Sequence, residues 1–240
     1  MKRILKSNCP IELAAYLEKY QTATWENFKN EDQKGYSIVC NIIKSDQLGI
    51  CCYCETDFEI SDSSHIKDFR VEHFYPKSQT PIPHTQENAH LTWRNLLGCC
   101  HGGSMNYIDD DRYTSPNLHC DAIKKENDWT HIILNPLDIP EDIKIFTFHT
   151  DGTMVLSDQC PINLQELAQS SIDKLNLNEK TYLVEARGKI RETLNAELDR
   201  KMKEEGLSIP QALEALKEEL FSNTATNMKF YTCKLDYVSY

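Results

Sequence analysis

The sequence lacks a long apolar segment. No run of apolar residues approaches the roughly 20 that a helix needs to cross a bilayer. The first residues, Met1-Lys2-Arg3-Ile4-Leu5-Lys6, are basic, but neither an apolar core nor a small-residue cleavage site of a secretory signal accompanies them. We therefore predict no membrane association and a cytoplasmic location.

Excess positive charge is also missing. The chain has 26 Lys and Arg against 37 Asp and Glu, a net charge of −11 at pH 7. A protein that binds nucleic acid unaided usually carries a basic surface, because neutralising phosphates supplies most of its affinity. If the protein acts on nucleic acid, either its positive charge is local or a partner holds the substrate.

The composition nevertheless predicts a folded protein. Hydrophobic residues make up 40% of the 240 positions and charged residues 26%, which is typical of a globular chain with one large domain or two modest ones. Residues 1–48 carry apolar and aromatic side chains at helical spacing, with a break expected near Gly35. Gly49 is placed to end the last of these helices.

The second half of the sequence predicts a hairpin followed by helices. Alternating segments on either side of Asp151-Gly152 indicate two strands within residues 132–156. From Leu164 onward the spacing is helical, and Ser208 is a candidate N-cap. The predicted fold class is α+β and mostly helical.

Most of the ten cysteines and eight histidines lie between Cys51 and Lys124. Without a secretory signal, so many cysteines are better explained as metal ligands and buried thiols than as disulfides. Cys51 and Cys54 have the two-residue spacing of a zinc knuckle, whereas Cys52 is too close to Cys54 for the usual turn.

The second pair of zinc ligands is less regular. Its candidates are Cys99, Cys100, His101, His119 and Cys120. The alternative to a metal site is a cluster of buried thiols that pack as small hydrophobic side chains.

Residues suited to phosphodiester hydrolysis lie between the two cysteine groups. Glu72 precedes His73, Asn95 follows, and Asp121 stands after the last cysteine. A neutral imidazole can take a proton from water near pH 7. Carboxylates can hold the divalent cation that stabilises charge on the transition state, and an amide can fix a loop by hydrogen bonding. A lone Glu-His pair is structural in most proteins, so the catalytic interpretation of Glu72 and His73 depends on their position between the two cysteine groups.

These motifs resemble the HNH (ββα-metal) nuclease superfamily. The matching pattern is Cys51-x2-Cys54, Glu72-His73-x2-Pro76-Lys77, Asn95-Leu96-x3-Cys100 and Cys120-Asp121-x2-Lys124. Over roughly residues 1–195 the chain is similar to the HNH endonuclease subunit of the Septu anti-phage system, the PtuB-like family, which also occurs beside some retrons. Trp25, Trp93 and Leu175-Asn176-Leu177-Asn178 contribute to this resemblance.

The resemblance implies two metal sites. Cys51, Cys54, Cys100 and Cys120 are then the ligands of a structural zinc. His73 is the expected general base and Asn95 the central Asn, both in the catalytic set. Glu72 and Asp121 complete that set as ligands of a catalytic Mg²⁺ or Mn²⁺. Asp121 stands where relatives have His or Asn, which leaves His119 as a competing ligand.

It also implies an organisation and a setting. A zinc-stabilised ββα-metal core, flanked by helices and a hairpin, corresponds to three regions: 1–48 (helical), 49–130 (nuclease core) and 131–240 (hairpin and C-terminal helices). The implied function is a metal-dependent endonuclease working with a PtuA-like ATPase in anti-phage defence. DNA is the favoured substrate, and RNA such as tRNA is the alternative. The competing hypothesis is a non-catalytic, zinc-stabilised subunit that binds nucleic acid or a partner.

Overall fold

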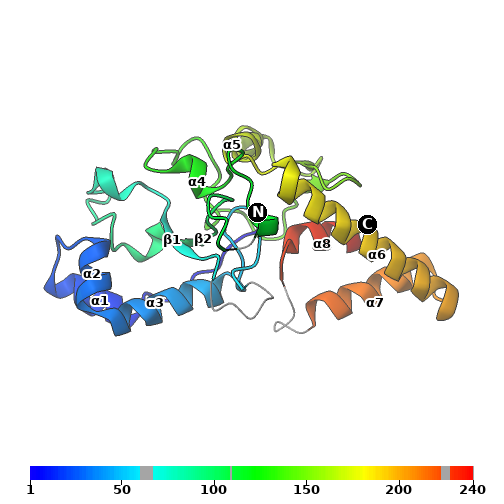
Figure 1. Ribbon diagram of the computed structural model, residues 1–240, viewed down its shortest axis with the longest axis horizontal. Helices are drawn as coiled ribbons and strands as arrows, with labels where there is room; N and C mark the ends of the chain where they lie inside the picture. The colour runs from blue at the N-terminus through cyan, green and yellow to red at the C-terminus, as the bar shows by residue number, and fades with distance from the viewer. Residues whose placement is uncertain (60–66, 109, 223–227, 240) are drawn as a thin grey trace.

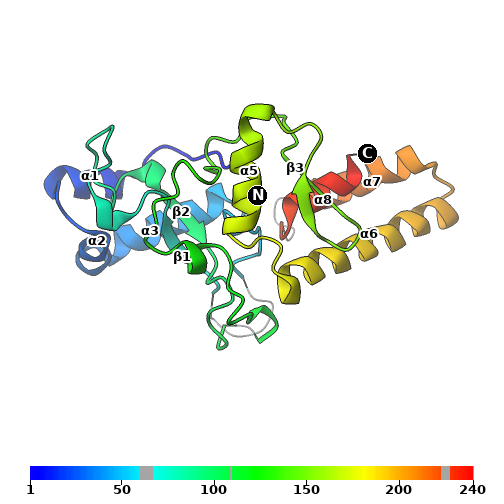
Figure 2. The same cartoon turned by 90° about the horizontal axis from the view of Figure 1, so that it is seen from above.

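The computed structural model describes residues 1–59, 67–108, 110–222 and 228–239. The molecule is elongated, with the N-terminal helices at one end and the C-terminal helices at the other (Figure 1). Between them lie the cysteine-rich segment, a β-hairpin and helix α5, which Figure 2 shows from above. The α+β, mostly helical fold class predicted from the sequence is confirmed.

The N-terminal region is helical, as predicted. It consists of α1 (Ile11–Lys19), α2 (Trp25–Glu31) and α3 (Gln33–Asp46). The break between α2 and α3 lies at Asp32, whereas the sequence had predicted it near Gly35. The Asp32 carboxylate accepts the backbone N–H of Gly35 at 2.8 Å, so it ends one helix and caps the next.

The central segment contains a short antiparallel pair of strands and a short helix. Strand β1 (Arg70–His73) pairs with β2 (Leu96–Cys99), and α4 (Asp121–Lys124) follows later in the chain. Between the strands run the 3-10 turns Lys77–Gln79 and Trp93–Asn95, and a third, Asp110–Arg112, precedes α4. The order strand, strand, helix is the order that the resemblance implied.

The remaining elements form the other half of the molecule. The predicted hairpin is present as β3 (Phe146–Phe148) and β4 (Met154–Leu156). The helices that follow are α5 (Ile162–Lys174), a π-helical turn (Lys180–Val184) that leads into α6 (Glu185–Glu204), then α7 (Ile209–Phe221) and α8 (Tyr231–Val238). Ser208 is the N-cap of α7, as predicted.

The cores connect these regions across the chain. One buried cluster joins the N-terminal helices to Leu91 and Trp93, which precede β2, and to Leu96, its first residue. A larger cluster surrounds the cysteines and extends through Phe146 of β3 to Leu183. The site segment therefore shares its packing with elements on both sides of it in the sequence. Among the described residues, no helix is long and apolar enough to span a membrane.

Leu96 offers a test of this packing. It is fully buried against the N-terminal helices and lies opposite His73 in the strand register. We expect Leu96→Ala to lower the free energy of unfolding by about 2–5 kcal/mol, as measured by chemical denaturation, because the cavity it leaves cannot fully collapse. Leu5→Ala, at a side chain that is 64% exposed, should change stability by less than about 0.5 kcal/mol. Equal losses in the two variants would contradict this packing.

Candidate functional site

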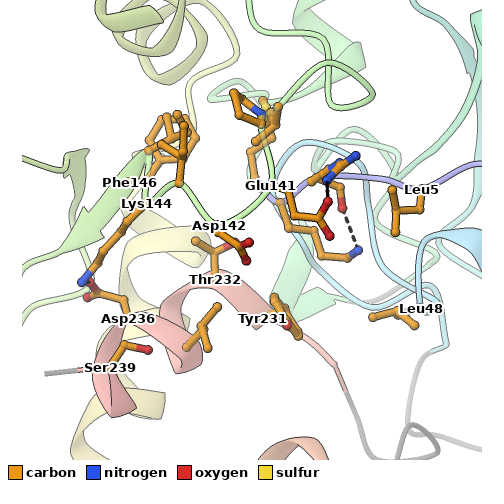
Figure 3. A pocket seen from close by; sticks show the side chains of 18 of the residues that line it. Leu5, Leu48, Glu141, Asp142, Lys144, Phe146, Tyr231, Thr232, Asp236 and Ser239 are labelled. Carbon is orange, nitrogen blue, oxygen red and sulfur yellow. Dashed lines mark hydrogen bonds and ion pairs between the residues drawn. The ribbon is translucent and has the colours of Figure 1, made fainter. Parts of the chain in front are cut away.

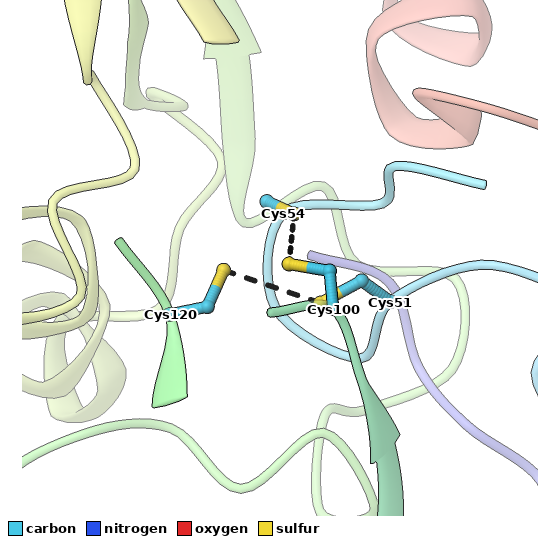
Figure 4. A group of neighbouring side chains, drawn as sticks. All are labelled: Cys51, Cys54, Cys100 and Cys120. Carbon is cyan, nitrogen blue, oxygen red and sulfur yellow. Dashed lines mark hydrogen bonds between the residues drawn. The ribbon is translucent and has the colours of Figure 1, made fainter. Parts of the chain in front are cut away.

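Four cysteine thiols converge in the middle of the molecule. Cys51 and Cys54 come from the turn before β1, Cys100 directly follows β2, and Cys120 directly precedes α4. Their sulfurs all lie within 4.8 Å of one another, with Cys54 Sγ 3.6 Å from Cys100 Sγ and Cys51 Sγ 4.0 Å from Cys120 Sγ (Figure 4). Zn–S bonds of about 2.3 Å place tetrahedral thiolates about 3.8 Å apart, so this donor set fits zinc.

Two glycines allow Cys120 to return to the other thiols. Gly102 and Gly103 have positive φ angles of 60° and 75°. A Cβ on Gly102 would lie 2.1 Å from the carbonyl oxygen of His119, and one on Gly103 would lie 1.9 Å from Oγ1 of Thr114. The loop after Cys100 can therefore close tightly only with glycine at both positions. Ser104 and Leu118 of this loop line a cavity beside β1.

His119 belongs to the thiol group and not to the carboxylates. Its Nδ1 lies 3.3 Å from Sγ of Cys120, and the ring is buried. Of the two candidates for the second cation ligand, the structure places only Asp121 on the cavity that Glu72 and His73 line. An imidazole beside a zinc-bound thiolate can donate a hydrogen bond to the sulfur, and such contacts orient the ligands of a metal.

His73 is held as a neutral base by strand β1 and its neighbours. Its Nε2 lies 3.1 Å from the carbonyl oxygen of His90. Because a carbonyl can only accept, Nε2 carries the hydrogen and Nδ1 keeps its lone pair. The ring packs edge-on against Trp25, with centroids 5.7 Å apart. Burial lowers the pKa of His73 from 6.5 to about 4, so the imidazole is neutral across the physiological range.

Glu72 is buried beside both positive and negative groups. Its Oε1 accepts from Nζ of Lys124 at 2.9 Å and from the hydroxyl of Tyr53 at 3.0 Å. Burial, followed by the neighbouring Asp121 carboxylate, raises the pKa of Glu72 from 4.5 to about 8. Two adjacent carboxyl groups that compete to remain ionised form a ligand pair that a divalent cation would stabilise.

Helix α4 carries Asp121 and Lys124, which form ion pairs with Arg70 and Glu72. Asp121, in its first turn, forms an ion pair with Arg70 of β1. Lys124, in its last turn, is fully buried and donates to the backbone oxygen of His73 at 3.2 Å as well as to Glu72. The carboxylates predicted to hold a cation are thus each paired with a cationic side chain in this structure.

Asn95 acts on the backbone. Its Oδ1 accepts the N–H of Tyr75 at 2.7 Å, and its Nδ2 donates to the carbonyls of Tyr75 at 2.9 Å and Ala89 at 2.7 Å. These bonds tie the segment after His73 to the segment that carries His90. The sequence placed Asn95 in the catalytic set and also suggested that its amide fixes the histidine's loop. These hydrogen bonds fit the second role, and the catalytic role of Asn95 stays a prediction.

A cavity of about 430 Å³ opens beside β1 and α4. The predicted residues His73, Glu72 and Asp121 line it. The other charged residues on its wall are Arg70, Lys77, Lys125 and Glu126. Acidic and basic groups are therefore balanced on this wall, and it does not present the local excess of positive charge that a nucleic-acid surface would have.

A larger cavity, of about 740 Å³, lies between the N-terminal segment, the loop before β3, and α8 (Figure 3). Charged side chains at its edge are paired: Arg3 with Glu141 at 2.8 Å and Lys144 with Asp236 at 2.6 Å. The described residues that line it include none of those predicted for metal binding or catalysis. Size alone therefore does not locate the chemistry.

Several partners of the site had no recognisable sequence signal. Arg70, Tyr53 and the His90 carbonyl contact the predicted residues through the folded structure. Lys124 belongs to the motif that carried the resemblance, but no role was predicted for it. Tyr53 lies between Cys51 and Cys54, but nothing in the sequence indicated that its hydroxyl contacts Glu72.

Comparison with known proteins supports an HNH nuclease. An Escherichia coli protein described as "Retron Ec83 putative HNH endonuclease" is 36% identical to this chain over 158 residues. The match covers 62% of this chain and 58% of the relative, so the chain spans less than two thirds of the relative's length. No family model matches the chain.

The thiol group predicts about one zinc per chain. We expect elemental analysis of purified protein to find close to one equivalent, and Cys100→Ser to reduce it to less than half, because three thiolates do not close a structural site. Cys40→Ser is the matched control, since Cys40 is buried in the separate N-terminal core. A full equivalent of zinc in the Cys100→Ser protein would exclude the proposed ligand set.

The raised pKa of Glu72 predicts a pH dependence of stability. Without a catalytic cation, the folded state keeps this proton up to about pH 8, whereas the unfolded chain releases it near 4.5. The folded state therefore binds more protons within this window, and the free energy of unfolding should fall as the pH rises through it.

Glu72→Gln removes this titration and is the reference. Chemical denaturation of the zinc-loaded proteins should show that the free energy of unfolding of wild type falls, relative to that of Glu72→Gln, as the pH rises from about 4.5 to 8. Saturating Mg²⁺ should oppose the loss, because the cation favours the ionised carboxylate. A difference between the two proteins that does not change with pH would show that Glu72 is not a buried carboxyl with a raised pKa.

Proposed function

We propose that this protein is a metal-dependent HNH endonuclease that hydrolyses phosphodiester bonds of nucleic acid. The observation that carries the proposal is the arrangement of His73, Glu72 and Asp121 on one cavity, with the imidazole neutral and its Nδ1 free of the His90 contact. The similarity to the retron Ec83 protein supports the same class of enzyme.

His73 is the proposed general base. Its Nε2–H is committed to the His90 carbonyl, so Nδ1 is the nitrogen that can accept a proton from water. That hydrogen bond and the Trp25 ring fix the orientation of the imidazole. Asn95 holds the two chain segments that set this geometry.

Glu72 and Asp121 are the proposed ligands of a catalytic Mg²⁺ or Mn²⁺. The donor set fits a hard cation, since both are carboxylates on an open cavity where water can complete the coordination. When bound, the cation would stabilise negative charge on the phosphate and the leaving oxygen. Arg70 and Lys124 keep positive charge beside the two carboxylates, and Lys124 partly opposes the burial that raises the pKa of Glu72. A structural zinc on Cys51, Cys54, Cys100 and Cys120 holds α4 beside β1.

We further propose that the protein is the effector subunit of an anti-phage complex with a PtuA-like ATPase. The balanced charge of the cavity wall and the net charge of −11 support a partner that contributes the basic surface for nucleic acid. DNA is the favoured substrate, with tRNA as the alternative.

The ion pairs of the carboxylates favour a second candidate, a non-catalytic zinc-stabilised subunit that binds nucleic acid or a partner. Lys124 and Arg70 satisfy Glu72 and Asp121 without any cation. In that case Mg²⁺ and His73→Ala would leave the activity of the complex unchanged, while Cys54→Ala would unfold the protein.

The nuclease proposal is tested with the assembled complex on plasmid DNA and on tRNA. His73→Ala should slow cleavage by about 10²–10⁴-fold, because the general base is lost. His131→Ala, at an exposed histidine, is the matched control and should cut at the wild-type rate. Both variants should keep one zinc per chain.

The outcomes separate the candidates. The nuclease proposal is supported if the wild-type complex cuts one substrate and His73→Ala does not. Chelation should stop the wild-type cleavage, and only added Mg²⁺ or Mn²⁺ should restore it. The nucleic acid that is cut identifies the substrate. Normal cutting by His73→Ala, or no cutting of either substrate by the wild-type complex, would refute it.

A further inference from the structure

A second group of buried thiols lies against the four predicted to hold zinc. The sulfurs of Cys51, Cys52 and Cys99 are all within 4.8 Å of one another, and those of Cys51 and Cys99 are 3.6 Å apart. Cys51 belongs to both groups. Cys52 and Cys99 belong only to the second, and no part of the proposed nuclease chemistry uses them.

The backbone explains why the two groups share one residue. Cys51 and Cys52 are consecutive, and so are Cys99 and Cys100. Cys99 is the last residue of β2 and Cys100 is the next residue, and their thiols are close enough to interact, so the two thiol groups adjoin. The N–H of Cys52 donates to the carbonyl of Gly98 at 3.0 Å, which holds the first doublet against this strand. Each doublet therefore contributes to both thiol groups.

Buried cysteines often pack merely as small hydrophobic side chains, and Cys40 in helix α3 and Cys233 in helix α8 have that environment. The group of Cys51, Cys52 and Cys99 differs because three sulfurs converge to the separations of metal-bound thiolates, beside a site of the same chemistry. Packing alone does not require that convergence.

We propose that Cys51, Cys52 and Cys99 form a second metal site, for a three-coordinate Cu(I) ion, with Cys51 bridging it to the zinc. Structural zinc requires four ligands, and this group of described residues offers three. Thiolates select soft ions, and Cu(I) is stable with three sulfur ligands. The site goes beyond the proposed nuclease function and shares only Cys51 with it.

The surroundings supply charge of the right sign. Three thiolates around a monovalent ion leave net negative charge, which is costly in a buried position unless it is compensated. The Arg70 guanidinium, which is paired with Asp121, also interacts electrostatically with Cys99 and Cys100. The Glu72 carboxyl interacts with Cys52 in the opposite sense, so Arg70 compensates this negative charge only in part.

The test is metal stoichiometry in the full chain. Zinc-loaded protein is titrated anaerobically with Cu(I) from a buffered complex, bound metal is counted by native mass spectrometry, and released zinc is measured with a chromogenic chelator. We expect wild type to bind one Cu(I) and keep its zinc. Cys52→Ser and Cys99→Ser should each keep one zinc and lose the Cu(I), and Cys40→Ser should behave as wild type.

Two results would overturn the inference. One is that wild type binds no Cu(I), or binds it only as zinc is released, which would mean a single metal site. The other is that Cu(I) binding survives in both Cys52→Ser and Cys99→Ser. Neither result bears on the nuclease proposal, which is tested separately by the zinc content of the protein and by the His73→Ala variant. The two serine variants lie on different segments, so misfolding of one leaves the other informative.

Discussion

The convergence of Cys51, Cys54, Cys100 and Cys120 is the constraint on which the rest of the site depends. These thiols come from before β1, after β2 and before α4, and their sulfurs lie within 4.8 Å of one another. A metal that closes this group fixes helix α4 against the strands. Asp121 and Lys124 can then reach Arg70 and Glu72. Because Cys120 directly precedes Asp121, the position of the thiol site and that of this carboxylate are linked through α4.

Much of this arrangement could be predicted, because ligand spacing and helical periodicity are local properties of a sequence. Three features were predicted in this way: the zinc-knuckle spacing of Cys51 and Cys54, the helical regions at both ends of the chain, and the hairpin at Asp151-Gly152. The choice of Cys100 over Cys99 came from the resemblance to HNH nucleases and not from spacing. The structure groups Cys100 with Cys51, Cys54 and Cys120, whereas Cys99 lies with Cys51 and Cys52.

The remainder depended on contacts between distant residues, which no spacing rule reports. The choice between Asp121 and His119 required knowing which side of Cys120 faces the cavity. The carbonyl of His90 fixes the tautomer of His73 through a backbone atom, so no side-chain pattern could indicate it. The helix break that the sequence predicts near Gly35 lies three residues earlier, at Asp32, whose carboxylate accepts the backbone N–H of Gly35.

The central claim is that one chain holds two chemically different metals, zinc on thiolates and a hard cation on Glu72 and Asp121. Anomalous diffraction from crystals grown with Mn²⁺, at the zinc and manganese edges, tests it most directly. We expect a zinc peak among Cys51, Cys54, Cys100 and Cys120 and a manganese peak between the two carboxylates. A cavity without manganese, in which Lys124 and Arg70 still pair with Glu72 and Asp121, would contradict it.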